Sequence, residues 1–204
     1  MSTRKPTEVM IKVRISFPNL FVPKKQKNST AEKYGAMFII SKEDKETVDT
    51  VKKAIIAAKK IGIAEKWGGK VPQGYKQPLR DGDAAPDPTD EDDSPVANPQ
   101  LKGCYYFNAT SFNKPGVLVR KNGKNVPATE EDIYPGCFCY ITANFYPYAN
   151  EGKGTTAGLN NVLKIAEGPR LDGRRSAEED FQDMDYAELD SLEDDDDLDM
   201  DDLL

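Results

Sequence analysis

The sequence predicts a mainly β protein, a small antiparallel barrel with one amphipathic helix and long loops, followed by a disordered acidic tail. Three observations lead to this fold class. Several short segments alternate apolar and polar residues, as half-buried strands do. One segment repeats apolar residues at spacings of three and four, the pattern of an amphipathic helix. The last 29 residues, 176–204, hold fifteen acids and no base, which is typical of unfolded chain.

Residues 9–17 form the clearest predicted strand, because apolar and polar residues alternate there with a period of two. The apolar residues of this alternation, which we expect in the core, are Val9, Ile11, Val13, Ile15 and Phe17. The opposite face carries Lys12 and Arg14. Pro18 and Pro23 then bracket a predicted turn, Lys24 and Lys25 follow it, and residues 34–40 form the second predicted strand.

A single amphipathic helix is predicted over residues 42–60. Its apolar positions Val48, Val51, Ile55 and Ala58 follow one another at spacings of three and four. Ser41 precedes the helix as the expected N-cap, in a near capping box that has Asp44 at the third position. Gly62 is the expected stop.

Regular periodicity is lost between residues 67 and 102. Residues 81–93 hold seven acids and no aliphatic side chain larger than that of Ala. We expect residues 75–80 to be ordered and residues 80–100 to contain a flexible acidic insert, since a loop of this length is either functional or disordered.

Strands are predicted again over residues 104–110, 117–121, 137–148 and 161–166. Several short strands, one helix and long loops favour the five-stranded OB-fold, a small Greek-key barrel. A ferredoxin-like α+β sheet is the alternative, but it requires a second strong helix, and none is evident before the tail. The predicted domains are therefore an OB-fold over residues 1–173 and a disordered acidic tail over residues 174–204.

Charge is distributed unevenly along the chain. The whole chain has a net charge of -7, whereas residues 1–175 hold 28 bases and 20 acids. Without residues 81–95, the same body has 28 bases against 13 acids. A basic body with an acidic tail predicts a protein that binds nucleic acid and regulates that binding with its tail.

Several function classes are disfavoured by composition. The chain has no histidine, which removes the commonest general base, the usual catalytic triads and most zinc sites. Cys104, Cys137 and Cys139 lack the spacing of a zinc site, and we expect them to be reduced thiols. No apolar stretch predicts a signal peptide or a membrane span. We therefore expect no enzyme activity, no cofactor and no metal.

The aromatic residues also favour nucleic-acid binding. The chain has eighteen aromatics, nine of them tyrosines, interleaved with bases, and exposed rings stack on the bases of single strands. In residues 137–148 the predicted core face comprises Cys137, Cys139, Ile141, Ala143 and Phe145. The opposite, unusually aromatic face comprises Phe138, Tyr140, Thr142, Asn144 and Tyr146.

Other aromatics are ambiguous. Phe112 precedes Lys114 in a predicted turn, where an exposed ring is unusual and therefore informative. Trp67 is equally compatible with a buried helix-end anchor and a stacking site. Tyr105 alternates with Tyr106 along the predicted strand, and the sequence leaves open which of them points into the core. The residues that we expect to contact nucleic acid are Lys12, Arg14, Lys24, Lys25, Trp67, Tyr75, Lys76, Arg80, Tyr105, Phe107, Phe112, Lys114, Arg120, Phe138, Tyr140 and Tyr146.

Short motifs across the body resemble those of tailed-phage single-stranded DNA-binding proteins. The resemblance covers about residues 8–173 and is carried, in order, by RISFPNLF at 14–21, WG at 67–68, PLRDGD at 78–83, GCYYFNATS at 103–111, KP at 114–115, YPGC at 134–137, NFYPY at 144–148 and GLNNV at 158–162. It implies an OB-fold that coats single-stranded DNA, without sequence preference, during phage DNA replication and recombination.

The same resemblance implies that the acidic tail competes with DNA and recruits a polymerase, a helicase-primase or a nuclease. The tail residues expected to bind such partners are Asp194, Asp195, Asp196, Asp197, Asp199, Asp201, Asp202, Leu203 and Leu204. Tails in related systems often end in an aromatic residue, whereas this chain ends in two leucines that would fill an apolar pocket. The expected location is the cytoplasm of a bacterial host cell. The sequence does not determine the oligomeric state, and a homodimer is one possibility.

Two other functions are compatible with parts of the sequence. A metal-dependent nuclease would use Asp81, Asp83 and neighbouring acids to hold magnesium, but two-metal chemistry requires carboxylates fixed on a rigid scaffold. A protein-interaction adaptor or DNA mimic would act through its tail alone and would gain nothing from a basic, aromatic body.

Overall fold

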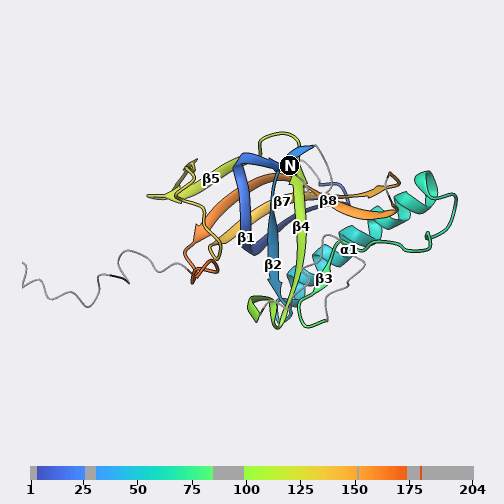
Figure 1. Cartoon of the computed structure of the whole chain (residues 1–204), viewed down its shortest axis with the longest axis horizontal. Helices are drawn as coiled ribbons and strands as arrows, with labels where there is room; N and C mark the ends of the chain where they lie inside the picture. Colours follow the sequence, from blue (N-terminus) through green and yellow to red (C-terminus); the bar gives the residue numbers. More distant parts are fainter. Residues whose placement is uncertain (1–3, 26–30, 85–98, 151, 174–179, 181–204) are drawn as a thin grey trace, which may run out of the picture. The chain divides into compact units, whose positions relative to one another are not determined.

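Five strands close into a barrel in the computed structural model, which describes residues 4–25, 31–84, 99–150, 152–173 and 180 (Figure 1). The chain divides into two units, residues 1–172 and 173–204, and the barrel belongs to the first. The barrel strands are β1 (Glu8–Lys25), β2 (Glu32–Ser41), β4 (Cys104–Ser111), β7 (Phe138–Tyr148) and β8 (Gly154–Ala166). Their order around the barrel is β1-β2-β4-β8-β7, and β7 pairs with β1 to complete it.

The predicted OB-type barrel is confirmed, with one refinement. All neighbouring barrel strands are antiparallel except β4 and β8, which pair in parallel through Ala109 with Ala157 and Thr110 with Gly158. This pairing closes the barrel, and the ferredoxin-like alternative is excluded because an open sheet would lack it. The described residues contain one α-helix, α1 (Lys45–Ile61).

The core lies inside the barrel and under α1. The inward faces predicted for β1 and β7 are confirmed from Val9 to Ile15 and from Cys137 to Phe145, since these alternate residues are buried. Phe107 lies at the centre, with its ring centroid 5.6 Å from that of Phe38 and 5.4 Å from that of Phe145. Aromatic packing of this kind stabilises a core beyond the area that it buries.

Helix α1 begins and ends later than the sequence predicts. Asp44, not Ser41, is the N-cap, and its carboxylate accepts a hydrogen bond of 3.0 Å from the Thr47 N–H. Gly62 has helical backbone angles and does not end the helix, which continues as a π-helical turn, η1 (Gly62–Lys66). The apolar stripe is confirmed, because Val48, Val51, Ile55 and Ala58 are all buried against the barrel.

Strand β1 is longer than predicted, and its pattern breaks at Phe17. The prediction that Phe17 enters the core is wrong, because its side chain is 64% exposed and its φ is 47°. The pairing of β1 with β2 is irregular between Ser16 and Asn19 and again before Lys24. Such bulges bend a strand, and the strand continues beyond the bulge as one half of an arm.

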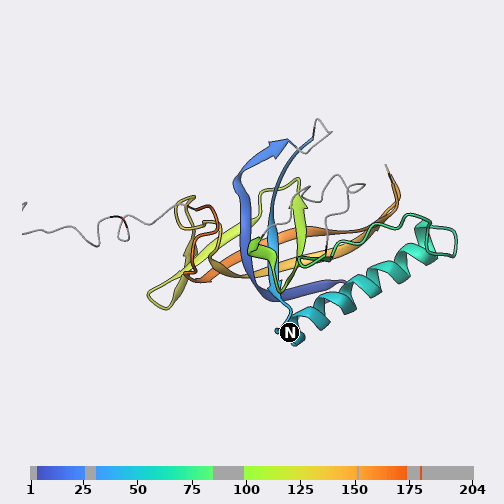
Figure 2. The same ribbon diagram turned by 60° about the horizontal axis from the view of Figure 1, so that its bottom comes forward.

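The arm is formed by residues 17–25 of β1 and residues 31–36 around the start of β2. Lys24 pairs with Lys33 near its end, and Figure 2 shows the arm projecting beyond the barrel. Helix α1 runs along another side of the barrel in the same view. The alternation rule did not predict the arm, because two prolines and a bulge interrupt the period of two.

The remaining elements lie at the edges. Strand β3 (Arg80–Asp81) pairs with β4, and the 3₁₀ turn η2 (Pro99–Leu101) precedes β4. Strand β5 (Gly116–Lys121) pairs with β8 and forms a hairpin with β6 (Lys124–Pro127). Most of the predicted acidic insert, residues 85–98, lies outside the described residues. None of the described helices has an apolar stretch of the length that a membrane crossing needs.

Candidate nucleic-acid interface

Residues from the arm and from the segment that follows β4 form a basic and aromatic surface that is exposed or partly exposed. We call it the arm surface, and its members are Phe17, Phe21, Lys24, Lys25, Lys33, Phe112 and Lys114. Tyr34 in β2 pairs with Ser111 at the end of β4, so the arm lies directly beside the segment that carries Phe112. The structure thus brings together Lys24, Lys25, Phe112 and Lys114, four residues that the sequence predicted.

Phe112 is the most exposed large apolar side chain of the described residues, at 69%. The Lys33 ammonium lies 4.8 Å from the centroid of its ring, and the Lys114 ammonium lies 5.8 Å from that of Phe21. Exposed rings with lysines beside them provide stacking faces for bases and cations for phosphates.

Tyr146 extends this surface across two strands. Its ring lies over Gly158 of β8, where an added Cβ would be 3.4 Å from the ring. Gly158 pairs with Thr110, and Phe112 follows two residues later, directly after the end of β4 at Ser111. Tyr146 is 42% exposed, and partial burial raises the pKa of its phenol. Tyr146 and Phe112 are therefore connected through Gly158 of β8 and Thr110 of β4.

Phe17, Phe21 and Lys33 were missed by the sequence analysis. Phe17 was assigned to the core by alternation, and Phe21 and Lys33 fell in a predicted turn and linker. One signal was present: Pro18 follows Phe17, and a proline inside a predicted strand marks an edge or a bulge. A bulky residue with positive φ is rare, and such strain is found preferentially at functional sites.

Four further predicted residues meet on the outer face of β1 and β7. Lys12 pairs with Tyr140, and Arg14 pairs with Phe138. The Lys12 ammonium and the Arg14 guanidinium lie 5.6 and 5.9 Å from the Phe138 ring centroid. Arg14 also donates hydrogen bonds to the carbonyls of Gly136 and Pro169, so its guanidinium holds a loop in place.

The residues predicted near the end of α1 have mainly structural roles. Trp67 is buried, and its Nε1–H donates a 3.0 Å hydrogen bond to the Tyr148 carbonyl. The prediction that Trp67 contacts nucleic acid is therefore wrong, and it anchors the helix end. Tyr75 packs edge-on against Trp67 and donates to the Thr155 hydroxyl, and burial raises the pKa of its phenol. The Lys76 carbonyl accepts a hydrogen bond from the Thr155 N–H of β8.

Phe107 is also corrected. Its ring is fully buried between Phe38 and Phe145, so it offers no face to a ligand. Tyr105 packs against the core and lies 5.1 Å from the ammonium groups of both Lys42 and Lys52. The register could not be read from sequence because β4 has large aromatic residues on both faces.

The last two predicted bases lie elsewhere. The Arg80 guanidinium carbon is 6.0 Å from the ring centroid of the buried Tyr106. Arg120 is exposed in the β5–β6 hairpin, where it pairs with Asn125. The contacts that define the arm surface include neither residue. All of the tail residues predicted to bind partners, from Asp194 to Leu204, lie outside the described residues.

The acids that a nuclease would use hold a lysine instead. The Lys42 ammonium forms ion pairs with Asp81 and, at 2.6 Å, with Asp83. These hydrogen bonds raise the pKa of Lys42 and lower those of both carboxyls. Asp83 also accepts a hydrogen bond from the Gly103 N–H. Within the described part of the chain, no three His, Cys, Asp or Glu side chains group as a metal site.

Comparisons with known proteins agree with this architecture. The chain is similar in fold to the single-stranded DNA-binding protein from bacteriophage Enc34, with a TM-score of 0.60 and 20% identity over 89% of this chain and 97% of that one. The same phage protein in complex with ssDNA gives a TM-score of 0.59 and 22% identity over 83% and 96% of the two chains. At this identity the likeness establishes the fold alone.

Sequence comparison establishes the family. A protein of Acyrthosiphon pisum secondary endosymbiont phage 1, described as putative protein p50, is 32% identical over 190 residues, which cover 88% of this chain and 95% of that protein. The family model described as Enterobacter phage Enc34, ssDNA-binding protein, matches residues 7–194. The chain therefore belongs to the family of the Enterobacter phage Enc34 single-stranded DNA-binding protein.

Proposed function

We propose that this chain binds single-stranded DNA without sequence preference and without catalysis, through the arm surface and Tyr146. Bases stack on Phe112, Phe21 and Tyr146, and Lys33 and Lys114 pair with phosphates. The observation that carries this proposal is the 69% exposure of Phe112 with the Lys33 ammonium over its ring. An exposed ring costs solvation free energy in the free protein and gains about 1–3 kcal/mol when a base stacks on it.

The fold supports this proposed location. OB-folds bind oligonucleotides on the face of their second and third strands and with the loop between the first two. Here the second and third barrel strands are β2 and β4, and the arm comprises the end of β1 and the start of β2. The solved relative in complex with ssDNA and the family assignment support the ligand class.

The acidic tail has a regulatory role in this proposal. It competes with DNA for the basic surface and recruits replication or recombination proteins in the cytoplasm of the host cell. The support is the contrast between fifteen acids without a base in residues 176–204 and 28 bases in the body. A tethered tail acts at an effective concentration of about a millimolar, so weak contacts suffice.

Arm-surface variants test the location. We expect Phe112→Ala to weaken binding of labelled oligo(dT) by about 5- to 150-fold, the equivalent of one lost stacking contact. Lys33→Ala should reduce the slope of log affinity against log salt by about 0.7, the effect of one phosphate contact on a single strand. Fluorescence anisotropy measures both quantities.

Two matched substitutions serve as controls. Val71→Ala removes another exposed apolar side chain, and Lys124→Ala removes an exposed lysine of β6. Both should leave affinity and salt slope unchanged. Equal losses in the arm variants and in the controls would place the DNA elsewhere on the body.

A further inference from the structure

The outer face of β1, β7, β8 and β5, four strands that are neighbours in the sheet, carries rings and basic side chains that are not part of the arm surface (Figure 1). Lys12 of β1 pairs with Tyr140 of β7. Tyr140 in turn pairs with Leu163 of β8, and Leu163 pairs with Leu118 of β5. Residues that pair directly across strands point to the same side of a sheet. We call this face the sheet surface, and its members are Met10, Lys12, Arg14, Leu118, Arg120, Phe138, Tyr140 and Leu163.

Apolar side chains of the sheet surface remain in contact with water. Met10, Leu118 and Tyr140 are 50%, 37% and 41% exposed. The residues that alternate with them, such as Val117 and Ile141, are buried in the core. The three exposed side chains therefore contribute little to the core, and a ligand that covered them would remove apolar surface from water, which is favourable.

The Phe138 ring holds two cations in place on this face. The Lys12 ammonium and the Arg14 guanidinium lie 5.6 and 5.9 Å from its centroid, and a cation is attracted to an aromatic ring at such a distance. Arg14 also donates to the carbonyls of Gly136 and Pro169, which leaves further N–H groups among the five donors of its guanidinium. The cations are thus positioned before a ligand arrives, which reduces the ordering cost of binding.

The charge of the sheet surface is entirely positive. Arg120 adds a third basic side chain, because it lies two positions after Leu118 and therefore on the same side of β5. Glu8, the first residue of β1, accepts a hydrogen bond from the Lys5 N–H. Within the described part of the chain, no carboxylate forms an ion pair with a basic residue of the sheet surface. Three basic side chains on one face suit a polyanion.

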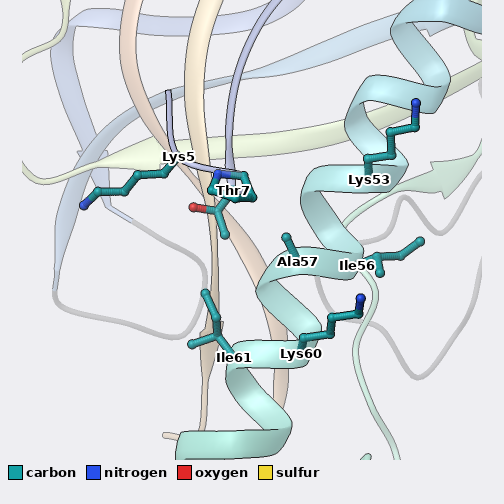
Figure 3. A pocket seen from close by; sticks show the side chains of 8 residues that line it. Lys5, Thr7, Lys53, Ile56, Ala57, Lys60 and Ile61 are labelled. Carbon is teal, nitrogen blue, oxygen red and sulfur yellow. The ribbon is translucent and has the colours of Figure 1, made fainter. Parts of the chain in front are cut away.

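The groove between the N-terminal segment and α1 provides a contrast (Figure 3). Lysines line this groove too, among them Lys53 and Lys60, beside the exposed Ile56. None of its eight lining residues is aromatic. The groove therefore offers charge and aliphatic surface without a ring for a nucleobase to stack on, whereas the sheet surface offers both charge and a ring.

We propose that the sheet surface binds a second segment of single-stranded DNA, beyond the segment held by the arm surface and Tyr146. A nucleobase stacks on Tyr140, and the three basic side chains pair with phosphates. Strand β7 connects the two sites, because Tyr146 and Tyr140 lie on the same side of it, six residues or about 20 Å apart. This inference rests on the proposed function, since it takes the same ligand, and adds a site to it.

Oligonucleotides of two lengths test the second site by fluorescence anisotropy with the full chain. A labelled oligo(dT) of about 6 nucleotides occupies the arm surface alone, and one of about 20 nucleotides reaches both sites, since one OB-fold holds about 4–16 nucleotides. We expect Tyr140→Ala to weaken binding of the long oligonucleotide by about 5- to 150-fold, the equivalent of one stacking contact. Its affinity for the short one should be unchanged, which also shows that the barrel is intact. Lys12→Ala should lower the salt slope for the long oligonucleotide by about 0.7.

Three further variants make the result specific. Tyr140→Phe keeps the ring and should bind both lengths as the unsubstituted chain does. Lys60→Ala removes an exposed lysine of the groove and should leave the salt slope unchanged. Phe112→Ala should weaken binding of both lengths, because each of them occupies the arm surface.

Three results would overturn the inference. If Tyr140→Ala bound the long oligonucleotide as tightly as the unsubstituted chain, the sheet surface would not contact DNA. If Tyr140→Ala weakened both lengths equally, the sheet surface would belong to the first site. A loss of salt slope in Lys60→Ala equal to that in Lys12→Ala would show that charge alone attracts the strand. In each case a loss of affinity in Phe112→Ala would still support the proposed function, whereas absence of binding by the unsubstituted chain would reject that function and this inference together.

Discussion

At Phe17, a single residue combines backbone strain with an exposed ring. Its φ of 47° places the backbone in the left-handed region, which costs a residue with a Cβ about 1–2 kcal/mol of conformational free energy. The ring is 64% exposed, so burial in the core does not compensate the strain. Ser16 before it and Leu20 after it are buried, and these two residues fix the bend that the strained residue must make. The ring is thereby left exposed to solvent.

Phe17→Gly and Phe17→Ala separate the two roles. Both variants lose the ring, so we expect both to weaken oligo(dT) binding to the same extent. Glycine accepts positive φ, whereas alanine does not, so the glycine variant should be more stable by about 1 kcal/mol. Urea unfolding and anisotropy titration measure the two effects. Unchanged DNA affinity in both variants would remove Phe17 from the interface.

The exposure of single residues was predictable from sequence where local chemistry is unusual, and it was not predictable where the packing of distant segments decides. Phe112 beside Lys114 stood out because an aromatic residue in a turn is rarely needed for packing. Trp67 and Phe107 are indistinguishable from stacking residues in the sequence, since an aromatic ring suits a core and a base equally well. Phe107 is buried in the core only because the strands pair and the barrel closes around it.

At the scale of elements, a carboxylate joins the turn before β7 to the β5–β6 hairpin. Asp132 accepts hydrogen bonds from the N–H and the hydroxyl of Thr129, at 2.8 and 3.0 Å. The Lys121 ammonium lies 2.7 Å from it. The hydrogen bond with Lys121, followed by that from the Thr129 N–H, lowers the pKa of Asp132 to about 2.

This depressed pKa predicts an acid-dependent part of the stability. Asp132 stabilises the fold above its unfolded pKa of about 4, and this contribution is lost as pH falls toward 2. Because Lys121 is exposed, we expect Asp132→Asn to cost only about 1 kcal/mol at pH 6. The difference from the unsubstituted protein should shrink between pH 4 and pH 2. Thermal unfolding across pH measures it, and a difference independent of pH would contradict the ion pair.

The regular elements were predicted well where periodicity is simple. The apolar stripe of α1 and the alternation of β7 gave correct faces, because each is uninterrupted over several residues. Strand β6 was missed although Asn122 and Gly123 form the tight turn before it, with φ of 50° and 77°. Asn-Gly is a strong hairpin signal, but the four residues of β6 are too polar to show alternation.

At the scale of the whole molecule, two opposite charge distributions share one chain. The body has an excess of bases and the tail an excess of acids, so net charge alone would wrongly suggest that the protein avoids polyanions. The fold gives this excess a location, because bulges and prolines in β1 build an arm on which lysines and exposed rings meet. Sequence predicted the ligand class from composition, whereas the arm surface emerged only once distant segments were paired.

The most direct test of this account is an anisotropy titration of labelled oligo(dT) across a salt series. It uses the full chain and a chain cut after Gly173, with duplex DNA of equal length as competitor. We expect both forms to prefer single strands, the cut chain to bind more tightly, and affinity to fall with salt with a slope of about 0.7 per phosphate contacted. Absence of binding by either form, or equal competition by duplex, would contradict the central claim.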